Sequence, residues 1–153
     1  MGSIAVLSGD PTQPQAHALL EASHALMGSL FPQEANHFLS IDRLTAPDIG
    51  FFIAQDKDDV LGCVALADCG TYGEVKSMFV DPAARGRGVG DALLRHLVDV
   101  ARARKLPRLC LETGTPGLEA AHRLYLRHGF KDCAAFGDYE DGAPFSRYMA
   151  RAL

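Results

Sequence analysis

The chain has 153 residues, of which 48% are hydrophobic and 22% are charged, and its formal net charge is −4. This length predicts a single domain over residues 1–153 with one core, and the composition excludes a disordered chain. The acidic balance disfavours a nucleic-acid-binding protein, whose charge is usually basic.

No targeting or metal-binding pattern stands out. The four cysteines (Cys63, Cys69, Cys110 and Cys133) show no paired Cys/His spacing typical of zinc sites. We therefore expect free thiols in a reducing compartment and no metal. Neither a signal peptide nor an apolar run of the ~18 residues that a membrane span needs is visible. We expect a cytoplasmic protein that binds no membrane.

The first 43 residues predict one strand and two helices. An apolar run predicts a strand over residues 3–8, which ends at a Gly-Asp-Pro turn. Apolar residues at helical spacing predict a helix through about Met27, with Thr12 as its cap. After a break at Pro32, a second, shorter helix is expected over residues 34–43.

The middle of the chain predicts three strands. Residues 49–55 and 60–67 are apolar runs that flank the polar turn Asp-Lys-Asp-Asp, which indicates a β-hairpin. Residues 72–80 predict a further strand, and the Asp-Pro pair that follows stops it.

The remainder alternates helices and strands. Helices are expected over residues 88–104 and 118–128, with a strand over residues 108–113 between them. The last strands are expected from Phe130 onward and over residues 145–153. A strand-helix-strand unit implies a right-handed crossover and a parallel pair, whereas the hairpin implies antiparallel pairing. We therefore predict an α/β (α+β) domain with a mixed sheet and helices on both faces.

The segment Arg85 to Gly90 (RGRGVG) packs three glycines where a strand ends and an amphipathic helix begins. Glycines at this density let the backbone turn sharply and approach a ligand closely. Free amides and the dipole at a helix N-terminus attract anions, and Arg85 and Arg87 add charge. The segment therefore predicts a phosphate or pyrophosphate site, the alternative being a plain helix start.

Two common phosphate motifs do not fit this loop. A Walker loop requires a Gly-Lys pair, which the chain lacks. The dinucleotide fingerprint GxGxxG, counted from Gly86 and Gly88, would require a glycine where Asp91 stands. A P-loop nucleotidase and a dinucleotide-binding domain are therefore disfavoured.

The loop resembles the R/Q-x-x-G-x-G/A signature of the GNAT N-acetyltransferase superfamily. Residues 121–130 (AHRLYLRHGF) are similar to the A-x-x-L-Y-x-x-x-G-F motif of the same family. Residues 74–80, 111–114 and 146–149 resemble a bacterial-type branch whose members mostly lack an assigned substrate. The resemblance implies the GNAT fold, with a mixed, mostly antiparallel sheet, two splayed parallel strands and acetyl-CoA as co-substrate.

The resemblance also implies roles for particular residues. The central strand would present its backbone at Met78, Phe79 and Val80 to the pantetheine arm, and Tyr125 would protonate the departing thiolate. The family often has Asn or Gln where Leu118 stands, so that side-chain contact is expected either to be absent or to be supplied elsewhere, for example by Thr113 or Thr115. The pyrophosphate would be held by Arg85, Gly86, Arg87, Gly88, Val89, Gly90 and Asp91.

Attack of an amine on a thioester needs a base, because a primary amine with a pKa of about 10 is mostly protonated at neutral pH. Glu74 is the first candidate, since the period of two in a strand places it on one face with Lys76, Met78 and Val80. Glu112 is the second candidate. For each, the alternative is a carboxylate paired with a neighbouring cation.

The acceptor side is less defined. Phe31, Phe38, Phe51 and Phe52 are expected to line either an acceptor pocket or the core. The acidic segment 138–141 would be either a docking site for a cation or a solvated turn.

The favoured function is N-acetylation of a small-molecule or peptide amine, without nucleic acid as a partner. A non-catalytic acyl-CoA sensor, a protein N-terminal or lysine acetyltransferase, and a homodimer all stay open.

Overall fold

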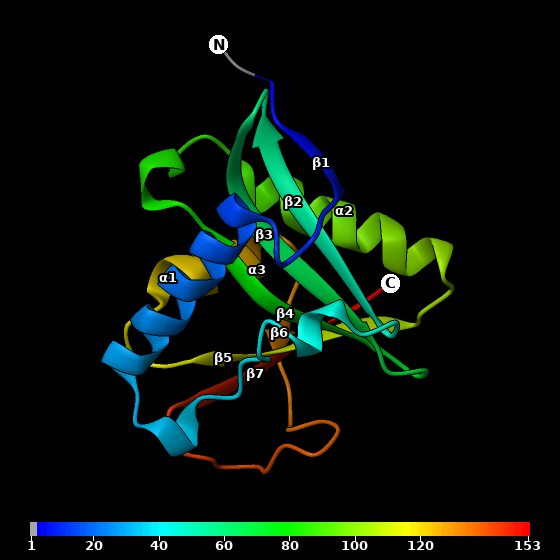
Figure 1. The fold of residues 1–153 in the computed structure, drawn as a ribbon. Coiled ribbons are helices and arrows are strands. Elements are labelled where there is room, and N and C mark those ends of the chain that lie inside the picture. The colour runs from blue at the N-terminus through cyan, green and yellow to red at the C-terminus, as the bar shows by residue number, and fades with distance from the viewer. Residues whose placement is uncertain (1–2) are drawn as a thin grey trace.

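The computed structural model describes residues 3–153 as one sheet with three α-helices (Figure 1). Short 3-10 turns precede β2 and α2. The elements in chain order are β1 (Ala5–Ser8), α1 (Pro14–Leu30), β2 (Ile49–Asp56), β3 (Asp59–Asp68), β4 (Gly73–Val80), α2 (Val89–Ala103), β5 (Arg108–Gly114), α3 (Glu119–Arg127), β6 (Lys131–Asp132) and β7 (Ser146–Ala152).

The seven strands lie in the order β1-β2-β3-β4-β5-β7-β6. Every neighbouring pair is antiparallel except β4 and β5, which run parallel across the α2 crossover. Helix α1 covers one face of the sheet, and α2 and α3 lie on the other (Figure 1). The predicted mixed, mostly antiparallel sheet with helices on both faces is confirmed.

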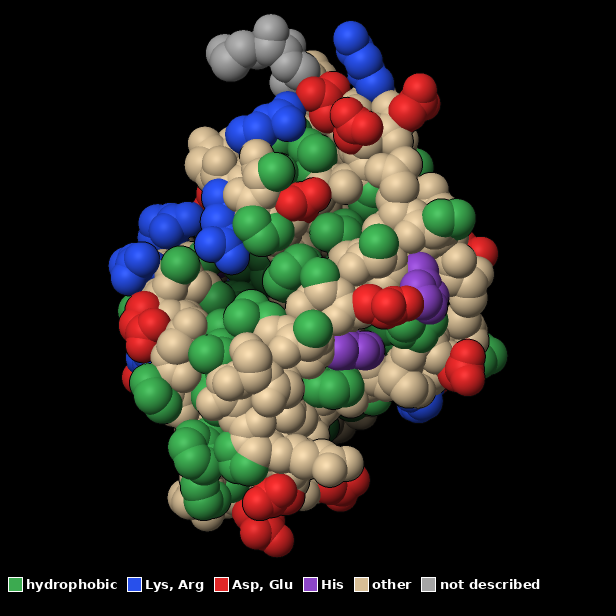
Figure 2. Space-filling model, turned by 60° about the vertical axis from the view of Figure 1, so that its left-hand side comes forward, with side chains coloured by type: hydrophobic (Ala, Val, Ile, Leu, Met, Phe, Trp, Pro, Cys, Tyr) green, Lys and Arg blue, Asp and Glu red, His purple; other side chains and the backbone are tan. Residues whose placement is uncertain are grey.

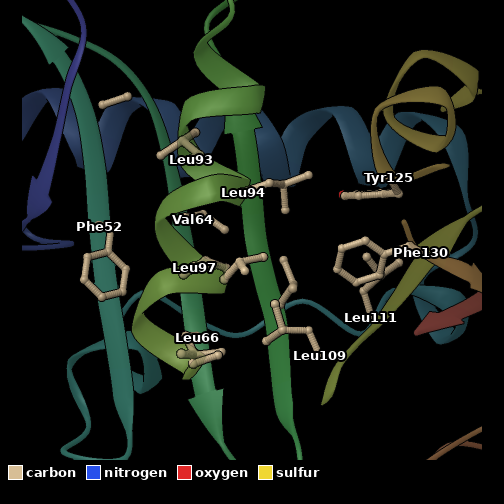
Figure 3. Packing of buried hydrophobic residues seen from close by; sticks show 14 of the residues in the cluster. Phe52, Val64, Leu66, Leu93, Leu94, Leu97, Leu109, Leu111, Tyr125 and Phe130 are labelled. Atoms are coloured by element: carbon tan, nitrogen blue, oxygen red, sulfur yellow. The ribbon is translucent and has the colours of Figure 1, made fainter. Parts of the chain in front are cut away.

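Alternation along β2 and β3 divides the core between these faces. Phe51 and Ile53 pack with α1, whereas Phe52 and Ala54 pack on the α2 face. On that second face, leucines of α2 lie against Phe52 and strand residues, while Tyr125 reaches in from α3 (Figure 3). Both faces of these central strands are therefore buried, which explains why their sequences are continuous apolar runs.

Strands β4 and β5 are paired only at their beginnings. Gly73 is opposite Leu109 and Glu74 is opposite Cys110, and no further pairing joins these two strands in the described chain. Strand β5 instead pairs with β7 along its whole length, from Arg108 to Gly114. The predicted splay of the two parallel strands is therefore present.

A bulge in β4 changes which side chains share a face. The β3–β4 register shifts between Cys63 and Ala65, and opposite this shift Ser77 has a φ of 53°. Val75 and Met78 pack together on the α2 face although three positions separate them. The expectation that Glu74 and Lys76 share a face with Met78 and Val80 is therefore wrong, because the extra residue of the bulge reverses the alternation.

Two local predictions near the N-terminus are also wrong. Helix α1 begins at Pro14, whose fixed φ suits the first helical turn, and Thr12 binds the Asp10 carboxylate instead of capping it. Residues 34–43 contain only short 3-10 turns at Gln33–Ala35 and Arg43–Thr45. Side chains there bond to nearby backbone, as when Ser40 Oγ accepts from the Arg43 amide, which competes with a helix.

The segment after α3 forms less strand than expected. Between Phe130 and β7, only Lys131–Asp132 joins the sheet. The chain then forms a loop that passes through Gly137 and Gly142, both at positive φ, before β7 begins. Over residues 3–153, no helix is both long and apolar enough to cross a membrane.

We predict that Gly62→Ala destabilises the protein by about 1–3 kcal/mol, a usual range for overpacking. A Cβ there would lie 2.9 Å from Val89 Cγ1 and 3.0 Å from the Phe79 carbonyl oxygen, so β3 and α2 would have to separate. Urea unfolding measures the change. Gly28→Ala is the control, because its Cβ would meet nothing within 4 Å and helix propensity favours alanine. Equal unfolding midpoints for the two variants would contradict this packing.

Candidate active site

The loop before α2 has the backbone geometry that its glycines predict. Gly86 has a φ of 82°, and Gly88, the N-cap of α2, has a φ of 78°. A Cβ at either position would meet nothing within 4 Å, so the backbone is open on that side. The loop is therefore accessible to a ligand that contacts the main chain.

The amides at this helix start are free to bind an anion. Those of residues 86–91 donate to no acceptor in the described part of the chain. Together with the helix dipole, they form a site for negative charge. Arg85 lines the adjacent cavity, whereas the guanidinium of Arg87 lies 2.8 Å from Asp56 Oδ2 and is absent from the cavity wall. Only one of the two arginines predicted to contact pyrophosphate therefore faces the site.

A cavity of about 980 Å³ extends from this loop through the gap between β4 and β5 to the C-terminal part of α1. Figure 2 shows a hollow whose walls are largely hydrophobic, with Lys and Arg side chains grouped beside it. At the loop end the lining includes Met78, Phe79, Val80, Arg85, Gly86, Gly88, Val89, Gly90 and Asp91. Most residues predicted to bind the cofactor are therefore brought together on one wall.

Asp91 has a structural role in addition to its place in the cavity wall. Its Oδ1 lies 2.7 Å from His128 Nε2 and 3.3 Å from an Arg127 nitrogen. The hydrogen bond with His128, followed by that with Arg127, lowers the pKa of Asp91. These contacts hold the C-terminal end of α3 against the start of α2.

Tyr125 lines the cavity from α3. Its side chain is buried, with its ring edge-on to Phe130, and its hydroxyl makes no hydrogen bond within residues 3–153. Burial, followed by the negative charge of Glu112, raises the pKa of Tyr125 to about 12. The phenol is therefore protonated at neutral pH. On the same helix, His122 Nε2 lies 2.9 Å from the Gly114 carbonyl, which is a structural contact.

Glu112 lines the same cavity from β5. Glu112 lies directly opposite Tyr148 in the pairing of β5 with β7, so these two side chains share one face of the sheet. Tyr125 packs on the other face. Ser146 Oγ donates a hydrogen bond to Glu112 Oε2 at 2.9 Å. Burial raises the pKa of Glu112, and the hydrogen bond from Ser146 partly offsets this rise. This carboxylate has no cation in direct contact among the described residues.

Glu74 is held in a separate buried network. Tyr139 donates to Glu74 Oε2 at 2.6 Å, and Lys76 Nζ lies 3.3 Å from the same oxygen. Lys76 also donates to the Tyr139 hydroxyl and to the His37 carbonyl, both at 2.9 Å. Glu74 is absent from the lining of the cavity. The position of Glu74 therefore matches the alternative expected from the sequence, which is a carboxylate paired with a neighbouring cation.

Only some of the aromatic and acidic residues considered for the acceptor site lie at the cavity. Phe31 and Phe38 line the cavity, whereas Phe51 and Phe52 belong to the core. The segment 138–141 does not border the cavity, and Tyr139 turns inward toward Glu74.

Leu118, which stands where the family often has Asn or Gln, lines the cavity. Of the two threonines that could supply the missing side-chain contact, Thr113 lines the cavity and Thr115 does not.

Several lining residues were not predicted from the sequence. They come from α1 and from the segment after it, and they include Ser23, Leu26, Met27, Asn36 and His37. The helix expected over residues 34–43 hid the second group, and the first resembles ordinary helix positions. Residues 3–153 contain no cluster of His, Cys, Asp or Glu suited to a metal ion.

Comparison with known proteins gives concordant matches. The acetyltransferase (GNAT) family model matches residues 16–130. The IAA acetyltransferase of Azospirillum brasilense is 40% identical over 156 residues, which cover 100% of both chains.

Solved structures share this fold. A Klebsiella pneumoniae subsp. pneumoniae protein, described by the general term acyl-CoA N-acyltransferase, superposes with a TM-score of 0.80 at 28% identity, covering 98% of this chain and 97% of its own. A GNAT family acetyltransferase from Elizabethkingia anophelis, crystallised with acetyl-CoA, gives a TM-score of 0.71 at 16% identity over 98% of each chain, a likeness of fold alone. The family match over most of the chain and the 40% identity over its full length show that this chain belongs to the GNAT family of acetyltransferases.

Proposed function

We propose that the protein transfers an acetyl group from acetyl-CoA to a primary amine, with Glu112 as the base and Tyr125 as the acid. The observation that carries this proposal is that both side chains line one cavity and approach it from opposite faces of the sheet. A base and an acid in this arrangement would act on the two sides of a group held in the gap between β4 and β5.

The loop end of the cavity suits the donor. Free amides at the start of α2, with Arg85 beside them, would hold the pyrophosphate. The backbone of β4 at Met78, Phe79 and Val80 would bind the pantetheine arm, because no β5 residue pairs with it there. Ser77 Oγ, which is buried and unpartnered, marks the same gap as a place for a polar ligand. When bound, acetyl-CoA supplies an activated acetyl group as its thioester.

Glu112 is better placed than Glu74 to accept the proton of the amine. Among the described residues Glu112 lines the cavity without a cation in direct contact, whereas Glu74 does not line the cavity and is held by Tyr139 and Lys76. The raised pKa of Glu112 also brings its basicity closer to that of the amine. This assignment reverses the order of preference expected from the sequence.

Tyr125 would donate a proton from its hydroxyl to the leaving sulfur. A pKa of about 12 keeps the phenol protonated at neutral pH. Because a thiol has a pKa of about 8.5, the phenol is the weaker acid and would act mainly through a hydrogen bond to the developing charge.

We expect Tyr125→Phe to lower kcat by about 10- to 100-fold, toward the lower end of the range for general acids. Acceptor-dependent release of CoA thiol measures the rate, and calorimetry with CoA should show unchanged affinity. Tyr72→Phe is the matched control, because Tyr72 lies outside the cavity wall. If Tyr125→Phe turned over as fast as the control, the acid role would be lost.

Glu112→Gln should lower kcat/KM by about 100-fold or more, as expected for loss of a general base. In the unaltered protein, the rate should rise with pH through the raised pKa of Glu112, and the variant should lack this limb.

Stability gives Glu112→Gln an independent readout. Because the pKa of Glu112 is higher in the folded chain than in the unfolded one, ionisation opposes folding at any pH above both values. The variant should therefore have an equal or higher Tm at pH 7. A fall in Tm matching the fall in activity would instead indicate a structural role.

Gly88→Val should weaken CoA binding by about tenfold or more, because a φ of 78° is unfavourable for a β-branched residue and its side chain would cover the free amides. Gly70→Val is the control, since Gly70 has a φ of 81° and open space but lies outside the cavity wall. Calorimetry should show weaker binding for the first variant only. Equal CoA affinity in both would refute the pyrophosphate assignment.

A further inference from the structure

The acceptor end of the cavity is mainly apolar. Between α1 and the β4–β5 gap, its walls include Leu26, Met27, Phe31 and Phe38. Phe38 is 41% exposed, and its ring stacks on His24 with centroids 4.1 Å apart. Phe31 is buried, and its ring lies beside that of the exposed Phe145, with centroids 6.1 Å apart. Aromatic surface left open at an entrance suits an apolar or aromatic ligand.

A smaller hollow of about 400 Å³ adjoins this end and shares Phe31, Asn36 and Phe38 with the main cavity. Gly28 and Gln33 complete its lining, so it adds no charged side chain. The two aromatic rings therefore border a continuous uncharged surface that leads away from the reaction centre.

The charges at this end limit what it can bind. Lys76 lines the wall, but its ammonium already donates hydrogen bonds to the His37 carbonyl and the Tyr139 hydroxyl, and it forms an ion pair with Glu74 at 3.3 Å. Withdrawing it toward a phosphate would leave the buried Glu74 without its cation, which is strongly unfavourable. The arginines Arg85, Arg123 and Arg127 line the cavity in the loop before α2 and along α3. In the described part of the chain, an acceptor with a phosphate group would therefore find no free cation beside the aromatic rings.

The number of carboxylates at this end also limits acceptors with several positive charges. Within residues 3–153, Glu112 is the one carboxylate that lines the wall between β5 and α1, because Glu119 lies on α3 and Asp91 lies at the start of α2. A second ammonium group would enter apolar surface without a counter-charge, which costs free energy. The site is therefore matched to a single positive charge.

We infer that the acceptor is a monoamine with an apolar, aromatic body, and this inference rests on the proposed function. Its amine lies at Glu112 and its body lies along Phe31 and Phe38. Phosphorylated amino sugars and polyamines are disfavoured by the same walls. The aromatic rings supply affinity through buried apolar area, and the single carboxylate fixes the position of the amine.

A panel of chemically distinct amines tests this inference. The rate of thiol release from acetyl-CoA is measured with 2-phenylethylamine, ethylamine, spermidine and glucosamine 6-phosphate. We expect kcat/KM for 2-phenylethylamine to exceed that for each of the others by about tenfold or more, since even one methylene group in an apolar pocket changes this ratio by about tenfold or more. A higher value for spermidine or glucosamine 6-phosphate would overturn the inference but leave the acetyltransferase proposal intact. If acetyl-CoA binds and no amine gives release, both fail.

A variant pair tests the placement of the aromatic body. Phe38→Ala should raise KM for 2-phenylethylamine by about fivefold or more, consistent with the loss of an aromatic contact of about 1 kcal/mol, and should not change CoA affinity measured by calorimetry. Leu7→Ala is the control, since it also truncates an exposed apolar side chain but lies on β1. Equal KM values for the two variants would show that the body binds elsewhere.

Discussion

The parting of β4 and β5 after two paired positions is the constraint on which the rest of the structure depends. Parallel strands joined by a helix normally continue to exchange backbone hydrogen bonds, and buried backbone groups left unpaired are unfavourable. Here β5 pairs through its other edge with β7 along its full length, and β4 pairs with β3 from Gly73 to Val80, so both strands stay within the sheet and only the edges that face each other lack partners. The unpaired edges face a gap that becomes the centre of the cavity.

The gap needs support on both sides if it is to stay open. Helix α2 packs its leucines on the strands to one side of it (Figure 3). Helix α3 is held close, because Gly90 has no Cβ to keep Leu124 away, and one would lie 2.7 Å from Leu124 Cδ2. The hydrogen bond between Asp91 and His128 ties the same two helices together. Packing and polar contacts at one helix start thus place Tyr125 beside the loop that would bind the donor.

What the sequence could predict was local. Strand β4, the glycine loop and helix α2 were predicted because each depends on neighbouring residues, and the two motifs fixed the family. The bulge at Ser77 was not predicted, because it arises from the β3–β4 register and reverses alternation without a glycine or proline to mark it. In residues 34–43, local side-chain bonds to the backbone compete with a helix, and the hydrogen bond from the distant Lys76 to the His37 carbonyl adds a contact that no local pattern reveals. The preference for Glu74 over Glu112 rests on strand alternation and cannot include the hydrogen bond between Tyr139 and Glu74, since these two residues lie 65 positions apart in the chain.

The two ends of the cavity are built on different principles. The donor end uses backbone amides, glycines and an unpaired strand edge, so its chemistry depends little on side-chain identity and can be read from a short motif. The acceptor end uses side chains from α1, from residues 31–38 and from β5, which meet only in the folded chain. A substitution among those side chains alters the acceptor surface and leaves the donor site intact. Proteins that share this donor end can therefore differ in acceptor, and under the proposed function the choice of amine would rest on side chains such as Phe38 and Glu112, which lie far apart in the sequence.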